Sequence, residues 1–245
     1  MALTDQAYTA RIPVPHMIVR GTDTTISCPV YLSGSLVVPT SGTVSVYDDG
    51  GTVVVNAAAV TITDSIAVYS VLGATTSSYS LADGWSVRWS ITLTGGVAVT
   101  PRSDAALIRQ AVYPVISDVD VYRRVPALDP SSQSVITRSA NYQSYLDEAW
   151  TTIQLRLIGL GERPWLVMSP SALRDPHLML TLALIFEDLA SRINPAYSDR
   201  AAAYRQDYEA AWRQMSYRYD TDDDGTADDK GARRSAVDSL WLVGR

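Results

Sequence analysis

Over the first hundred residues, apolar and polar side chains alternate in short runs that end at Gly, Pro or Asp. The clearest run is GWSVRWSITL, in which Trp85, Val87, Trp89, Ile91 and Leu93 share one face of an extended strand. The junctions YDDGGTV and LTGGVAV are typical of hairpin turns, because Gly and Asp tolerate the backbone conformations of tight loops. Short strands at this spacing predict an antiparallel β-sandwich over residues 1–112.

The alternation fades after the sandwich, and prolines interrupt the segment TPRSDAALIRQAVYPVISDVDVYRRVPALDPSS. We expect a last strand or short helix here, followed by an extended connector over residues 113–138.

Three segments beyond the connector have apolar residues at helical spacing, and they predict a helical domain over residues 139–218. ANYQSYLDEAWTTIQLRLIG carries an aromatic stripe and ends at Gly159 and Gly161. DPHLMLTLALIFEDLASRIN is apolar on nearly all sides, which predicts an enclosed helix that stops before Pro195. SDRAAAYRQDYEAAWRQM is expected to begin at a Ser198 cap, with Arg205, Glu209 and Arg213 paired along its outer face.

Composition separates the same two regions. Residues 1–100 hold nine charged side chains and residues 101–245 hold the remaining thirty-seven of forty-six. The sequence therefore predicts an α+β multidomain protein, an N-terminal antiparallel β-sandwich followed by a C-terminal α-helical bundle.

The net charge of −6 argues against extensive binding of nucleic acid, since neutralising phosphates requires clustered Lys and Arg. The longest apolar stretch, around LMLTLALIF, is too short to span a bilayer, and the N-terminus has neither a basic start nor an apolar run. We expect a soluble protein without a membrane partner and without a visible export signal.

The residues expected of an enzyme are not found together. His16 and His177 are far apart, no GxSxG, HExxH or CxxC pattern occurs, and the lone Cys28 lies in a predicted strand. GLGERP has no third glycine and no preceding strand to form a phosphate loop. We expect no catalytic residues and a protein that is not an enzyme.

An acidic segment, YDTDDDGTADDKG, follows the third predicted helix. Its carboxylates alternate, and a glycine stands at the sixth position, as in loops that wrap oxygen ligands around calcium. The candidate calcium ligands are Asp220, Asp222, Asp224, Thr226 through its backbone carbonyl, and Asp228. The twelfth position, where such loops carry a bidentate glutamate, is Gly231, so a solvated acidic turn is the competing interpretation.

The end of the chain, residues 219–245, is expected to form the acidic loop and a C-terminal docking arm. An apolar SLWLV stretch follows the acidic residues, with two arginines ahead of it. The candidate docking residues are Arg233, Arg234, Leu240, Trp241, Leu242 and Val243. We expect them to dock on a partner chain, with packing against their own domain as the alternative.

The helical half resembles the head-tail connector (adaptor, or head-completion) proteins of long-tailed bacteriophages. The resemblance covers roughly residues 139–230. It rests on the order of an aromatic first helix ending in Gly, RPWLVMSPSALRDPHLMLTLALIFEDLA, a Tyr-rich YRQDYEAAWRQM helix and YDTDDDG.

The resemblance implies a non-enzymatic virion protein in the neck between capsid and tail, assembled in the host cytoplasm. Its partners would be further copies in a ring of about twelve, the portal protein and a tail-side neck or tail-terminator protein. DNA would pass through the ring without sequence-specific binding, which an acidic channel favours. The family has no active site to transfer, and its smallest members lack a sandwich.

Two other interpretations remain open. One is a calcium-dependent glycan- or receptor-binding module built on the sandwich. It is disfavoured because Trp85 and Trp89 share a face with aliphatic residues rather than polar ones. The other is a different structural component of the tail or baseplate.

Overall fold

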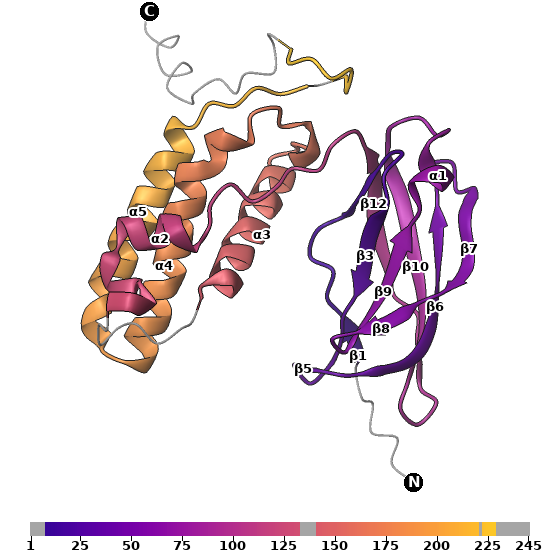
Figure 1. Ribbon diagram of the computed structural model, residues 1–245, viewed down its shortest axis with the longest axis horizontal. Helices are drawn as coiled ribbons and strands as arrows, with labels where there is room; N and C mark the ends of the chain where they lie inside the picture. The colour runs from indigo at the N-terminus through magenta and orange to yellow at the C-terminus, as the bar shows by residue number, and fades with distance from the viewer. Residues whose placement is uncertain (1–7, 133–140, 221, 229–245) are drawn as a thin grey trace, which may run out of the picture. The chain divides into compact units, whose positions relative to one another are not determined.

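A computed structural model describes residues 8–132, 141–220 and 222–228 of the chain (Figure 1). Two compact units are present, Met1–Ala111 and Val112–Arg245. The first is built from β-strands and the second from helices, which confirms the predicted α+β class.

Three sheets make up the first unit. The largest runs in the order β2 (His16–Val19), β12 (Arg102–Ile108), β10 (Ala82–Leu93), β6 (Pro39–Tyr47) and β7 (Val53–Ala59), with β11 (Ala98–Val99) also paired to β10. The second contains β3 (Thr24–Cys28), β9 (Ile66–Val71) and β8 (Thr61–Thr63), and the third β1 (Tyr8–Ala10), β4 (Val30–Leu32) and β5 (Ser35–Leu36). All pairs are antiparallel except β12 with β2, a parallel pair that strand alternation alone does not predict.

The core of this unit is formed by side chains from all three sheets, including Val30 of β4. Trp85 and Trp89 of β10 are 1% and 2% exposed and pack with Ile26 of β3 and Val71 of β9. The predicted inner face of β10 is confirmed, while Arg88 on the opposite face is exposed and lies over the Tyr47 ring.

A short helix, α1 (Gly73–Thr76), fixes the loop that leads into β3. Asp23 accepts a hydrogen bond of 2.8 Å from the Gly73 amide, and the Gly21 amide donates to the Thr76 hydroxyl at 3.1 Å. A Cβ added to Gly73 would lie 2.5 Å from the Gly21 carbonyl carbon. Glycine is required here because the two backbone segments touch.

The second unit contains α2 (Asp118–Arg124), α3 (Gln143–Gly159), α4 (Arg174–Arg192) and α5 (Ser198–Gln214) (Figure 1). Short 3-10 helices connect them: η1 (Pro126–Leu128), η2 (Pro130–Ser132), η3 (Pro164–Leu166), η4 (Pro170–Leu173) and η5 (Pro195–Tyr197). Helix α4 contacts α2, α3 and α5 and buries residues around its whole circumference, as its apolar sequence predicts.

Residues 113–132 differ from the expected extended connector. They contain α2, η1 and η2, and Val121, Val125 and Leu128 are buried with α3 and α4 residues in the helical core. A capping box starts α2, in which Ser117 and Asp120 bond reciprocally. Asp118 accepts a hydrogen bond of 2.8 Å from the Tyr142 amide. Both carboxylates therefore stabilise the local structure.

Two details of α5 also differ from expectation. Ser198 is the first residue of α5 rather than its cap, and Asn194 caps the preceding η5 by accepting from the Ala196 amide. Arg205 pairs with Glu187 of α4 and Glu209 with Arg156 of α3, so the expected pairs along one helix are replaced by pairs between helices.

Candidate functional site

The acidic loop follows α5 and is held against η3 and the residues after it. Tyr219 forms a β-bridge with Val167, and its hydroxyl accepts a hydrogen bond of 2.8 Å from the Arg163 amide. The Asp220 amide donates to the Leu166 carbonyl at 3.0 Å. These contacts give the loop a fixed start, which residue spacing alone does not show.

Three of the predicted ligands are brought together. One carboxylate oxygen from each of Asp220, Asp222 and Asp224 lies within 4.8 Å of the others. Asp220 is 1% exposed, while Asp222 and Asp224 are exposed. The described residues 219–220 and 222–228 thus place three acids around one point, as the alternating spacing predicts.

Backbone amides donate hydrogen bonds to several of these carboxylate oxygens. The two Asp220 oxygens accept from the amides of Asp224 at 3.1 Å and Gly225 at 2.7 Å. Asp224 in turn accepts from the Thr226 amide at 2.7 Å and from its hydroxyl. Such bonds stabilise the turn with or without an ion.

The other two predicted ligands are less closely placed. The Thr226 side chain is exposed and bonds to Asp224, and Asp228 is outside the cluster of three, with its amide donating to the Tyr219 carbonyl at 3.0 Å. Calcium takes six to eight oxygens, so the three carboxylates supply only part of a site.

Like charge is concentrated in the loop. The pKa of Asp222 is raised by desolvation first and then by the negative charge of Asp224. A bound cation would relieve this repulsion, so the electrostatics of the loop favour cations over anions.

The predicted docking residues Arg233, Arg234, Leu240, Trp241, Leu242 and Val243 lie outside the described residues. Their expected role stays a prediction.

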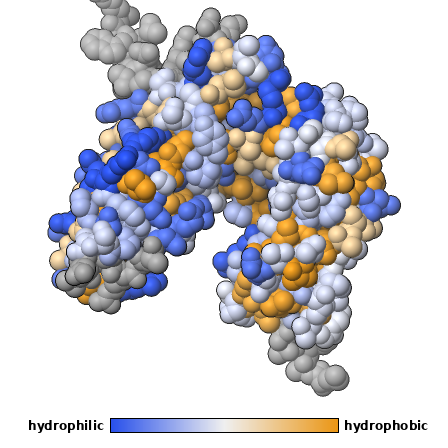
Figure 2. Space-filling view, viewed as in Figure 1, coloured by the Kyte–Doolittle hydropathy of each residue, from blue (hydrophilic) through white to orange (hydrophobic). Residues whose placement is uncertain are grey.

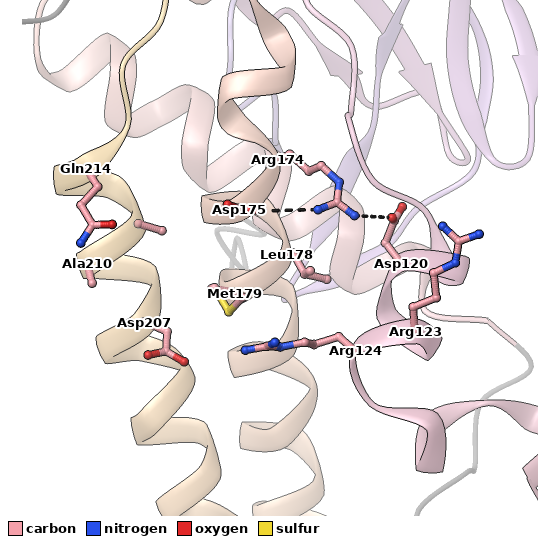
Figure 3. A pocket seen from close by; sticks show the side chains of 11 residues that line it. Asp120, Arg123, Arg124, Arg174, Asp175, Leu178, Met179, Asp207, Ala210 and Gln214 are labelled. Atoms are coloured by element: carbon pink, nitrogen blue, oxygen red, sulfur yellow. Dashed lines mark hydrogen bonds and ion pairs between the residues drawn. The ribbon is translucent and has the colours of Figure 1, made fainter.

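A cleft in the helical unit was not predicted from the sequence. Its volume is about 520 Å³, and α2, α4 and α5 form its walls (Figure 3). Leu178 and Met179 of α4 and the small Ala210 and Ala211 of α5 give it an apolar floor. The short side chains of Ala210 and Ala211 occupy little of this space.

Charged side chains surround this floor. The other lining residues are Asp120, Arg123, Arg124, Arg174, Asp175, Asp207 and Gln214. Arg174 binds Asp120 at 2.7 Å and Asp175 at 3.5 Å (Figure 3). Partial burial alone would raise the pKa of Asp120, but bonds from Ser117 and Arg174 outweigh it and lower that pKa. Within the described part of the chain, Arg123, Arg124 and Asp207 have no ion-pair partner.

The cleft therefore offers hydrophobic contact together with unpaired charges of both signs. On the face of the helical unit that carries α2, hydrophobic and hydrophilic side chains stand next to each other (Figure 2). The sequence did carry a signal for helix α2: SDVD, residues 117–120, is a capping-box pattern that predicts a helix start at Ser117, although prolines flank the segment.

Comparison with protein-family models, curated proteins and solved structures found no match to this chain. No helix in the described residues is long and apolar enough to cross a membrane.

Proposed function

We propose that this chain is a non-enzymatic structural protein of a bacteriophage virion, a subunit of the head-tail connector ring between portal and tail. The observation that carries the proposal is the chain order of the helical unit. The aromatic helix α3, the enclosed α4, the Tyr-rich α5 and the acidic loop follow one another, and this order is the one on which the resemblance rests.

Burial of the reactive side chains supports a structural role. The Cys28 thiol is fully buried, and burial raises its pKa to about 12, so it is protonated at neutral pH. His177 is fully buried between α3 and α4, where it bonds to the Leu146 carbonyl. These groups contribute to packing rather than face a substrate.

Charge supports passage of DNA without attachment. With a net charge of −6 per chain, a ring of about twelve copies would repel phosphates rather than bind them. The sandwich would extend from the ring or meet a tail protein.

The alternative of a calcium-dependent glycan- or receptor-binding module is weakened by the two tryptophans. Both are almost fully buried, so neither offers a ring face for sugar stacking. A component of the tail or baseplate would have the same fold and would differ in its neighbours.

The experiment that tests the proposal is mass photometry of the chain alone and mixed with the portal ring encoded in the same genome. We expect a species with the mass of the portal plus about twelve copies of the chain. A control mixture with an unrelated portal should show no such species. Failure to bind the cognate portal would contradict the connector role and favour a tail component.

A further inference from the structure

The cleft between α2, α4 and α5 has the properties of a peptide-binding groove. Its volume is about 520 Å³, within the range of roughly 300–1,000 Å³ that is usual for ligand sites. An apolar floor bordered by charges favours a segment that carries both apolar and charged residues.

Such a segment exists in the same chain. Beyond Asp228, the last described residue, the sequence continues with DKGARRSAVDSLWLVGR. It contains the apolar run Leu240–Val243, the basic pair Arg233 and Arg234, and the acidic Asp238. We propose that the cleft is the docking site for the C-terminal segment of its own chain, residues 233–245.

The charges of the cleft and those of the C-terminal segment are complementary. The cleft presents Arg123 and Arg124 of α2 and Asp207 of α5, which lack ion-pair partners within the described residues. Figure 3 shows the Arg124 side chain extending across the cleft towards α5. The segment supplies arginines for the acid and Asp238 for the two arginines.

Chain length permits docking within one molecule. The cleft reaches along α5 from Asp207 to Gln214, the end of the helix from which the chain continues into the acidic loop. Eleven residues separate Asp228 from Leu240 and span up to about 36 Å when extended. A tethered segment has an effective concentration near the millimolar range, which favours the chain's own cleft over that of another copy.

This inference does not depend on the connector role. If the chain does join a ring, a partner that binds the C-terminal segment has to displace it from the cleft.

Disulfide trapping in the full chain tests the proposal. The double variant Ala210→Cys with Leu242→Cys places one thiol in the cleft and one in the segment, and buried Cys28 gives little background. Oxidised glutathione would take up the two electrons, so that the two thiols lose their protons and form one S–S bond while two glutathione thiols are released. The matched control is Ala202→Cys with Leu242→Cys, since Ala202 is exposed on α5 and does not line the cleft.

We expect an intramolecular bond in the cleft variant, detected by intact mass and non-reducing electrophoresis, that forms at least about tenfold faster than in the control. Equal rates in both variants would overturn the proposal. Bonds only between molecules would show that the cleft takes the segment of another copy, which also overturns it.

A second measurement tests the proposal in case the geometry of the two thiols prevents a disulfide from forming. In the single variant Ala210→Cys, replacing Leu240, Trp241 and Leu242 by Ser should raise the alkylation rate of Cys at position 210 severalfold. An unchanged rate would mean that the segment does not cover the cleft.

Discussion

Arg156 of α3 and Glu209 of α5 form a two-point ion pair, in which each guanidinium Nη atom lies 2.8 Å from one carboxylate oxygen. The guanidinium carbon also lies 4.4 Å from the ring centre of Trp212. This contact joins two helices whose pairing the sequence did not predict.

Arg156→Ala should lower the free energy of unfolding of the helical unit by about 1–2 kcal/mol. The pair is partly exposed and contributes up to about 1 kcal/mol, and the cation–π contact adds about 0.5–1 kcal/mol. Thermal and urea unfolding measure the change. Arg218→Ala, which removes an exposed arginine of the helical unit that has no ion-pair partner among the described residues, should have little effect. Equal stability of Arg156→Ala and the parent would refute a stabilising role.

Mild acid should weaken the protein through the half-buried His16 and the fully buried His177. Burial lowers the pKa of His16 to about 4 and also lowers the pKa of His177. The unfolded state therefore binds protons below about pH 6.5 that the folded state does not bind, so stability falls as the pH decreases from 6.5 towards 4. At pH 5.5 the loss is about 1 kcal/mol for His16.

Urea unfolding at pH 7.5 and pH 5.5 checks this expectation. His16→Gln and His177→Gln should each reduce the difference between the two pH values, whatever their effect on absolute stability. A pH dependence that persists unchanged in the double variant would assign it to other groups.

The periodicity of the sequence predicted individual strands and helices better than it predicted the contacts between them. The inner face of β10 and the enclosure of α4 follow from one strand or helix taken by itself, and both are confirmed. The parallel pairing of β2 with β12 joins segments far apart in the chain, and the burial of α2 depends on α4, the second α-helix after it. Local patterns carry no information on such long-range contacts.

The same limit applies to the candidate sites. Asp220, Asp222 and Asp224 are close in sequence, so alternation was sufficient to predict that they meet. The cleft combines residues from 120 to 214, and its apolar floor exists only once α4 packs against α5. A cleft between helices can therefore be found only from the tertiary structure.

Gly73→Ala should destabilise the sandwich unit. The added methyl carbon would lie 2.5 Å from the Gly21 carbonyl carbon, and backbone cannot move aside as a flexible side chain can. We expect a loss of about 1–3 kcal/mol, typical of overpacking, in thermal unfolding. Gly50→Ala is the matched control, because its new carbon would meet only the Asp48 side chain at 3.5 Å. Comparable losses in both variants would show that the close approach of Gly73 to Gly21 is not the cause.

Calcium binding by the acidic loop would be weak, because three clustered carboxylates supply fewer than the six to eight oxygens that the ion prefers. If the dissociation constant is about 10⁻⁴–10⁻³ M, 5 mM calcium stabilises the folded chain by about 1–2 kcal/mol and raises Tm by a few degrees. Differential scanning fluorimetry of a chelated sample measures the shift. Asp222→Ala should abolish it, because Asp222 offers an exposed carboxylate to the ion. Asp199→Ala, which removes an acid from the first turn of α5, should retain the shift. An unchanged Tm at millimolar calcium would identify the loop as a turn held by its own backbone bonds.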